Sequence, residues 1–408
     1  MAEKVVVGMS GGVDSSVAAY LLKLQGYEVI GVTMKVWDPD EPVSCERDNR
    51  CCGETAVDDA RRVCVRLGIP YYVVGYRDLF QEKVIDPFVA EYLRGRTPNP
   101  CLVCNRYVKW EAVLSRADAL GAHYVATGHY ARVERLADGR YTVRNAVSAA
   151  KDQTYALCRL TQEQLARTLM PLGEYQKSEV RRIAQEAGIP VAQKPDSEDI
   201  CFIHDGDVAG FVDRAAGERA PGPGRFVNRD GRDLGEHRGI THYTVGQRKG
   251  LGLAMGHPVF VTGLDAAANI VRIGGAEDVM SDTLVCRDLN FMAAAEGDLP
   301  VGSVIGTDCA GGAESSATAC AGASAAVSAA GGAGAAPDSD AEEGTVDALP
   351  RRIFCKIRYS APPAPCTIVR TGEDEITAHF AERVRAVTPG QQAVFYEDGH
   401  VLLAGAIA

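Results

Sequence analysis

Short apolar runs alternate with helix-like periods along the first 200 residues of the chain. Residues 4–8, 28–34 and 71–74 are apolar runs of strand length. The stretches between them, 15–25 and 55–68, repeat apolar residues at the spacing of one helix face. This alternation predicts an α/β domain with a mainly parallel sheet.

Beyond about residue 205 the pattern changes to short strands separated by glycine and proline. Residues 258–263 and 269–273 alternate apolar and polar positions and predict a small β-rich central domain. Residues 283–304 and 351–408 alternate in the same way, which predicts a C-terminal β-barrel or sandwich. The chain is therefore expected to contain three domains, at residues 1–205, 206–280 and 281–408.

One segment of the C-terminal part lacks the pattern of a folded domain. Of residues 310–336, 23 of 27 are Ala, Gly or Ser, too few large side chains to offset the entropy of ordering them. We therefore expect a disordered insertion in a surface loop at about residues 308–350. A helical stalk is the alternative.

The composition narrows the class of protein. Apolar residues make up 46% and charged residues 24%, as in a soluble globular protein. No run of 18 apolar residues is present and the N-terminus lacks the layout of a signal peptide, so we expect no membrane span and no secretion. Thirteen cysteines, an odd number in a long chain, favour reduced thiols in the cytoplasm over a disulfide framework.

The distribution of charge matters more than its total. A net charge of −11 by itself disfavours a nucleic-acid partner. Residues 308–350 hold seven acids and no base, and without those acids the net charge is −4. Residues 351–370 hold five bases and no acid. Charge therefore excludes no class of partner.

A glycine- and serine-rich loop, GMSGGVDSS at residues 8–16, joins the first predicted strand to the first helix. Its glycines allow backbone to approach an oligophosphate, and helix N–H groups and serine hydroxyls supply donors. Asp14 would repel bare phosphate, which suggests a bridging Mg²⁺ or a water-mediated contact. No Gly-Lys-Ser/Thr follows and the loop is not G-x-G-x-x-G, so it is neither a Walker loop nor a dinucleotide turn. The loop resembles the PP-loop of ATP pyrophosphatases, which cleave ATP between its α and β phosphates.

Cysteines in two parts of the chain are candidates for a functional role. Cys101 and Cys104 form a C-x-x-C pair after a proline-containing stretch, 97–100, that predicts a stiff non-helical loop, and Cys201 is a further candidate. These thiols could be inert core residues, a Cys₃His zinc site completed by His204, or redox-active sulfur carriers at Cys104 and Cys201. Spacing alone favours the core over zinc, and zinc over sulfur chemistry.

Longer motifs change that order. The chain resembles bacterial tRNA-specific 2-thiouridylases, which sulfurate the wobble uridine of tRNA. The stretches that carry the resemblance include GMSGGVDSSV (8–17), GRTPNPCLVCNRYVKW (95–110), KPDSEDICFI (194–203), GEHRGITHYTVGQRKGLGL (235–253) and AVTPGQQAVFYEDG (386–399). The resemblance implies a PP-loop domain, a small central domain and a C-terminal β-barrel, and it raises sulfur chemistry above the other two interpretations.

The resemblance also implies roles for individual residues. Cys201 would carry a persulfide supplied by a cysteine desulfurase or sulfur-carrier protein, and Cys104 would be its partner thiol, able to close a disulfide with it after transfer. ATP, with Mg²⁺, would be held by Gly8, Met9, Ser10, Gly11, Gly12, Val13, Asp14, Ser15, Met34 and Gly128. The target base and tRNA would be contacted by Asn99, Pro100, Cys101, His129, Lys151, Asp152, Gln153, Arg358, Tyr359 and Gln391.

The implied reaction adenylates the C2 oxygen of uridine and replaces it with sulfur, releasing AMP and pyrophosphate. We expect a cytoplasmic monomer with no resident metal. A structural role is the alternative for His129, and residues 177–182 form a charged helix face that suits either tRNA or solvent. Three other functions remain open: an amidating PP-loop synthetase, an iron–sulfur or zinc protein on Cys101, Cys104 and Cys201, and a non-catalytic RNA-binding module.

Overall fold

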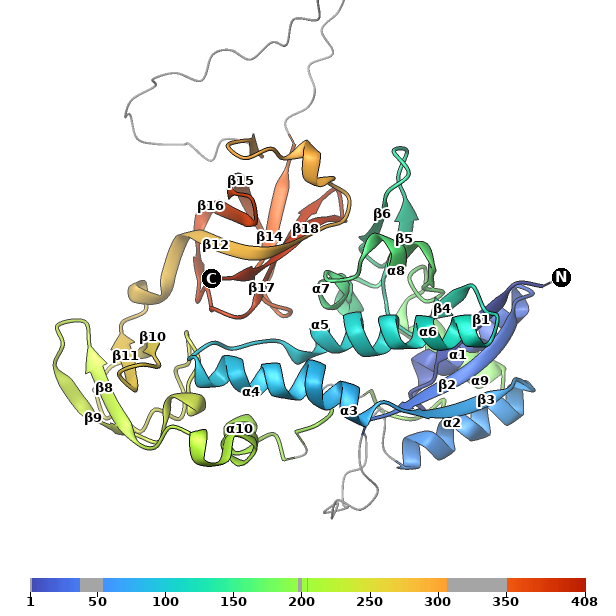
Figure 1. Ribbon diagram of the computed structural model, residues 1–408, viewed down its shortest axis with the longest axis horizontal. Helices are drawn as coiled ribbons and strands as arrows, with labels where there is room; N and C mark the ends of the chain where they lie inside the picture. Colours follow the sequence, from blue (N-terminus) through green and yellow to red (C-terminus); the bar gives the residue numbers. More distant parts are fainter. Residues whose placement is uncertain (1, 37–53, 197–199, 204, 307–350) are drawn as a thin grey trace, which may run out of the picture.

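The computed structural model describes residues 2–36, 54–196, 200–203, 205–306 and 351–408 (Figure 1). The predicted insertion at 308–350 and the candidate zinc ligand His204 lie outside these residues. The described chain forms a parallel α/β domain, a smaller β-rich domain and a closed β-barrel. The predicted fold class is thereby confirmed, and barrel rather than sandwich is the C-terminal architecture.

The first domain contains a parallel sheet of five strands in the order β3-β2-β1-β4-β7. Its strands are β1 (Lys4–Gly8), β2 (Glu28–Lys35), β3 (Tyr71–Gly75), β4 (Tyr124–Ala126) and β7 (Thr168–Leu169). Helices α1 (Val13–Leu24), α2 (Glu54–Leu67) and α9 (Lys177–Glu186) contribute to the hydrophobic cluster that includes Val5 and Val7 of β1. Val6, which points to the other face, packs with α6 (Val113–Ala119). Residues 5–7 of the central strand are therefore all valine because both faces of the strand are covered.

Two long helical stretches run side by side below the barrel in Figure 1. One comprises α3 (Arg77–Phe80), the π-helical turn η1 (Gln81–Ile85) and α4 (Asp86–Leu93). The other comprises α5 (Pro100–Cys104), the π-helical turn η2 (Asn105–Ala112) and α6. The stiff loop predicted at 97–100 therefore ends at Asn99, and Cys101 and Cys104 are helical. Pro100 stands at the first helical position, where a missing N–H costs nothing, so proline starts the helix instead of preventing it.

The barrel is closed by six strands in the order β12-β16-β15-β14-β17-β18, with β18 pairing back to β12. Its strands are β12 (Met280–Phe291), β14 (Ile353–Lys356), β15 (Ala364–Gly372), β16 (Glu375–Arg385), β17 (Gln392–Glu397) and β18 (His400–Ile407), with β13 (Val304–Ile305) added to β15. Closure leaves no unpaired edge among these six. The hairpin of β5 (Arg132–Arg135) and β6 (Tyr141–Arg144) extends from the first domain to pair with β18.

The first domain and the barrel share one hydrophobic cluster. Trp110 and Tyr155 of the first domain pack in it with Val394 and Val401 of the barrel, and all four are fully buried. The Tyr155 hydroxyl also donates to the Gln392 carbonyl at 3.0 Å. The two parts are therefore held together by a common core, which places barrel residues next to the candidate site.

Helix α10 (Val208–Ala216) packs in one cluster with Phe80 and Phe88 of the first domain, whereas the β-rich central domain that follows has a core of its own around Phe226, Tyr243 and Val261. Its four strands, in the order β10-β11-β8-β9, are β8 (Gly224–Asn228), β9 (Asp233–His237), β10 (Phe260–Asp265) and β11 (Ile270–Gly274). The remaining short elements are η3 (Ala149–Lys151), α7 (Thr154–Leu157), α8 (Gln162–Ala166), η4 (Gly217–Arg219), η5 (Ile240–His242), η6 (Glu277–Val279) and η7 (Glu296–Asp298). Within the described ranges, no helix is both long enough and apolar enough to cross a membrane.

Candidate functional site

The glycine-rich loop leaves the carboxyl end of β1 and is tied to the neighbouring strand. The Met9 N–H donates to the Val32 carbonyl at 2.8 Å, and the Thr33 hydroxyl donates to the Met9 carbonyl at 2.7 Å. Across the turn, the hydroxyls of Ser10 and Ser15 hydrogen-bond each other at 3.1 Å. The loop is therefore held in shape before any ligand arrives.

Two glycines in this region tolerate no side chain. Gly11 has φ +67°, and a Cβ there would stand 2.3 Å from the Ala56 carbonyl oxygen. A Cβ on Gly128 would stand 2.5 Å from the Ser15 amide nitrogen. Met34 joins them, because its Cε is 3.8 Å from where a Gly8 Cβ would be. The residues that the sequence assigned to ATP, 8–15, 34 and 128, thus converge at one place.

Asp14 is engaged by two residues that the sequence analysis did not assign to this loop. The Lys177 ammonium donates to both carboxylate oxygens of Asp14, at 2.7 and 2.8 Å, and the Tyr130 hydroxyl donates to Oδ1 at 2.8 Å. Burial and the nearby Asp14 charge raise the pKa of Tyr130, so its hydroxyl remains a donor. The charged helix face predicted at 177–182 therefore directs Lys177 to the loop rather than to solvent.

A second carboxylate, Asp196, extends this charged network. Lys177 reaches its Oδ1 at 2.8 Å, Arg181 the same oxygen at 3.0 Å, and Lys151 its Oδ2 at 3.0 Å. Burial opposes ionisation of Asp196, but the hydrogen bonds from Lys177 and Lys151 outweigh it, and the pKa of Asp196 lies below its ordinary value. Lys151, expected at tRNA, is thus part of the network beside the loop.

Cys104 and Cys201 pack against the same apolar cluster. Both are half-buried, and the cluster is built around aromatic side chains that include Phe88 and Phe202. Met34, which borders Gly8 of the loop, also packs against this cluster. The two predicted thiols therefore share one apolar cluster with Met34, whose Cε lies near Gly8 of the loop.

Cys101 has a different environment from Cys104. It is exposed in the first turn of α5, where its N–H donates to the Asn99 side chain at 3.0 Å. Among the described cysteines, five others are buried: Cys64, Cys158, Cys286, Cys355 and Cys366. Burial raises the pKa of the Cys64, Cys158 and Cys286 thiols to about 12, which makes them inert.

Among the residues that the structure describes, no group of three or more His, Cys, Asp or Glu side chains is arranged to hold a metal ion. With His204 outside those residues, the zinc arrangement considered from the sequence has no described geometry.

The barrel contacts the segment that carries the residues predicted to contact the target base. Gln391 donates through Nε2 to the Thr97 carbonyl at 2.7 Å, just before Asn99 and Pro100. His129, which follows β4, hydrogen-bonds the Thr127 hydroxyl through Nδ1 at 2.7 Å. Gln391 therefore supports the loop that carries the predicted base-contacting residues.

The remaining residues predicted to contact tRNA lie on a loop of the first domain and on the barrel. Asp152 accepts from the Ala146 N–H at 2.8 Å and the Thr154 hydroxyl at 2.6 Å, and Gln153 accepts from the Tyr130 N–H at 2.8 Å, so these side chains shape their own loop. Tyr359 of the barrel, 45% exposed, donates to the Asp152 carbonyl at 3.3 Å. Arg358 instead donates to the Arg385 carbonyl within the barrel, at 2.9 Å.

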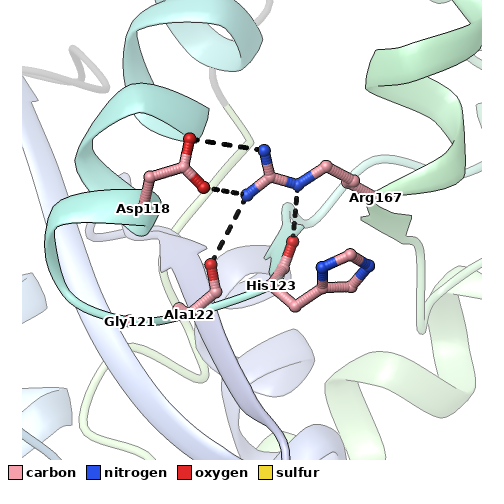
Figure 2. A pocket seen from close by; sticks show the side chains of 5 residues that line it. All are labelled: Asp118, Gly121, Ala122, His123 and Arg167. Carbon is pink, nitrogen blue, oxygen red and sulfur yellow. Dashed lines mark hydrogen bonds and ion pairs between the residues drawn. The ribbon is translucent and has the colours of Figure 1, made fainter.

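A surface pocket elsewhere on the first domain is unrelated to this site. Figure 2 shows Arg167 donating to the carbonyls of Ala122 and His123 and pairing with Asp118. His123 precedes β4, so the pocket lies at the amino ends of the strands, whereas the glycine-rich loop follows the carboxyl end of β1. Because ligands of open parallel sheets bind at the carboxyl ends, this pocket is not the candidate site.

Comparisons with known proteins cover the whole chain. Family models match as a tRNA methyl transferase HUP domain over residues 3–205, a tRNA methyl transferase PRC-barrel domain over 210–275 and an aminomethyltransferase beta-barrel domain over 339–407. The chain is 47% identical to a tRNA-specific 2-thiouridylase MnmA of Lachnoclostridium phytofermentans, over 99% of both chains. It is 46% identical to a tRNA-specific 2-thiouridylase MnmA of Clostridium perfringens, over 99% of this chain and 98% of the relative. A solved 4-thiouridine synthetase–RNA complex with bound ATP is 19% identical with a TM-score of 0.34, over 53% of this chain and 51% of its own.

Proposed function

Since the chain belongs to the tRNA-specific 2-thiouridylase family, we propose that it catalyses ATP-dependent 2-thiolation of the wobble uridine of tRNA. The observation that carries the proposal is the position of Met34 between the glycine-rich loop and the cluster that holds Cys104 and Cys201. Met34 lies near Gly8 of the loop that would hold the nucleotide, and it packs against the same cluster as the two half-buried thiols. An activating step and a sulfur-transfer step therefore have a common place to act.

The first step makes a leaving group. The uridine C2 oxygen attacks the α-phosphorus of ATP, the bond to the β-phosphate breaks, and pyrophosphate departs. Residues 8–15 would hold the phosphates, with the backbone at Gly11 and Gly128 bare of side chains so that the loop can close around them. The C2 oxygen then leaves as AMP, a far better leaving group than oxide.

The second step delivers sulfur. Cys201 would carry a persulfide from a cysteine desulfurase or sulfur-carrier protein, and its outer sulfur would attack C2 as AMP departs. Cys104 would then attack the inner sulfur of Cys201, which leaves the outer sulfur on the base and closes a Cys104–Cys201 disulfide. A thiol reductant would restore both thiols. Packing of both cysteines on one cluster supports this exchange.

Mg²⁺ would arrive with ATP and neutralise charge on its phosphates. The carboxylate predicted to approach it, Asp14, is engaged by Lys177 and Tyr130 and in this arrangement does not fit a divalent cation. We therefore assign no step to a metal held by Asp14.

The proposal is tested by incubating the protein with unmodified tRNA transcript, ATP, Mg²⁺ and a persulfide source. Mass spectrometry of digested tRNA should show 2-thiouridine at the wobble position, with one AMP released per thiolated base. Omission of ATP and the Cys201→Ser variant serve as controls. Turnover of ATP to AMP without thiolation, or thiolation that needs no ATP, would contradict it.

A further inference from the structure

The carboxylate of Asp196 gathers three cations from two separate elements. Lys177 and Arg181, one turn apart on α9, both reach Oδ1, and Lys151 at the end of η3 reaches Oδ2. The side chain of Asp196 is 23% exposed and that of Lys177 is 15% exposed. Partly desolvated charge pairs of this kind are stronger than surface pairs. Asp196 is thus a partly buried anion held by a dedicated set of cations.

The same cations lie beside the loop proposed to hold ATP. Lys177 contacts Asp14, in the first turn of α1, through both carboxylate oxygens. Lys194, two residues before Asp196, donates to the Gly11 carbonyl at 3.3 Å and pairs with Asp59 at 2.9 Å. The network of Lys151, Lys177, Arg181 and Asp196 therefore borders the oligophosphate site.

The cations of this network could bind an anion of higher charge than a carboxylate. The three cations and the two carboxylates, Asp14 and Asp196, leave one formal positive charge beside a loop of backbone donors. An ATP triphosphate or a pyrophosphate carries more charge than a carboxylate and has more acceptor oxygens, so it would compete effectively for the same ammonium and guanidinium groups.

We infer that Asp196 is a built-in competitor for oligophosphate: its carboxylate occupies Lys151, Lys177 and Arg181 until the β- and γ-phosphates of ATP, or free pyrophosphate, displace it. This inference rests on the proposed use of ATP. It adds Lys151, Lys177 and Arg181 to the residues expected to hold the phosphates of ATP, and it makes Asp196 a competitor of those phosphates. The alternative is that Asp196 positions the cations for phosphate. The two differ in sign, because removing a competitor strengthens phosphate binding and removing a positioning residue weakens it.

The test measures binding of inorganic pyrophosphate by isothermal titration calorimetry to the full chain without tRNA. Asp196→Asn should bind pyrophosphate about ten-fold more tightly than wild type, the size expected when one charged hydrogen-bonding partner stops competing. Lys177→Gln should bind it about ten-fold more weakly. Asp118→Asn, which removes an acid from the Arg167 pair in Figure 2, and Arg182→Gln, on the exposed face of α9, should leave affinity unchanged.

Thermal unfolding of each variant verifies that it is folded, and Asp196→Ser provides a second removal of the carboxylate. Unchanged or weaker pyrophosphate binding in both Asp196 variants would overturn the inference while leaving the proposed function intact, provided that wild type still binds ATP and thiolates tRNA. Failure of wild type to bind either ATP or pyrophosphate would overturn the inference together with the ATP-dependent part of the proposed function.

Discussion

At the scale of the residue, the environments of three cysteines separate their expected roles. Cys104 and Cys201 are half-buried on one cluster, whereas Cys101 is exposed one helical turn away. Because Cys101 lies outside the environment that the two predicted sulfur carriers share, it is expected to line the base pocket rather than to react.

We therefore predict that Cys104→Ser and Cys201→Ser each abolish thiolation while ATP and tRNA affinities stay within a few-fold of wild type. Cys101→Ser should retain at least about a tenth of the rate, because it removes neither sulfur carrier. Single-turnover thiolation and equilibrium binding measure these effects. A Cys101→Ser variant as inactive as Cys104→Ser would show that Cys101 takes part in catalysis, or binds a metal if wild type contains iron or zinc.

Gly11 is the residue at which backbone conformation and close contact both demand glycine. Gly11→Ala should lower the free energy of unfolding by more than about 2 kcal/mol, since it adds strain at φ +67° and a clash with the Ala56 carbonyl. The same variant should also lose ATP binding. Gly26→Ala is the matched control, because Gly26 has φ +92° with nothing within 4 Å of an added Cβ. Urea unfolding and ATP titration would contradict the prediction if the two variants behaved alike.

At the scale of the element, His237 at the end of β9 makes the central domain sensitive to acid. The side chain is 3% exposed; its Nδ1 accepts from the Gly239 N–H at 3.0 Å and its Nε2 donates to the Asn269 carbonyl at 3.1 Å. Only neutral imidazole can accept at Nδ1. Burial lowers the pKa of His237 below its ordinary value.

The folded state binds a proton on His237 less tightly than the unfolded state does. The free energy of unfolding is therefore highest above about pH 6.5 and falls as the pH drops below that value. We predict that the unfolding temperature of the central domain decreases between about pH 7.5 and about pH 5.5. Scanning calorimetry measures the shift, and His242→Gln, which replaces the histidine paired with Asp213, should retain it. NMR titration of His237 at or above pH 6.5 in the folded protein would contradict the cause.

At the scale of the whole molecule, the first domain and the barrel share a core, whereas the central domain has its own. The two arrangements predict different unfolding behaviour. A cavity in the shared core should destabilise both of its contributors, and a cavity in the central core should act only locally.

Val401→Ala in the barrel should therefore cost about 2 kcal/mol and reduce hydrogen-exchange protection in the first domain as well. Val261→Ala is the matched change in the central domain, since both valines are 0% exposed. It should reduce protection there alone. If Val401→Ala left exchange in β1 and β4 unchanged, the shared cluster would not couple the two parts.

The sequence by itself was sufficient for whatever depends on local pattern. The apolar runs and helix periods of the first 200 residues predicted the parallel α/β domain, and the GMSGGVDS motif predicted the strand–loop–helix that bears it. Hydrophobic period and glycine placement depend on burial and backbone conformation within a few residues, so they can be interpreted without knowledge of the fold. The prediction of a non-helical loop through Pro100 was wrong because proline can start a helix as well as end one.

The tertiary structure alone decided which distant charged residues meet. Asp14, Tyr130, Lys177 and Asp196 lie on four separate segments, and a helix face such as 177–182 has the same sequence pattern whether it faces solvent or a buried carboxylate. The same holds for the Gln391 contact with Thr97, across 294 residues. Local periodicity specifies which side of a helix or strand is apolar. Only tertiary packing, within the first domain and between it and the barrel, specifies which polar groups are brought within hydrogen-bond distance.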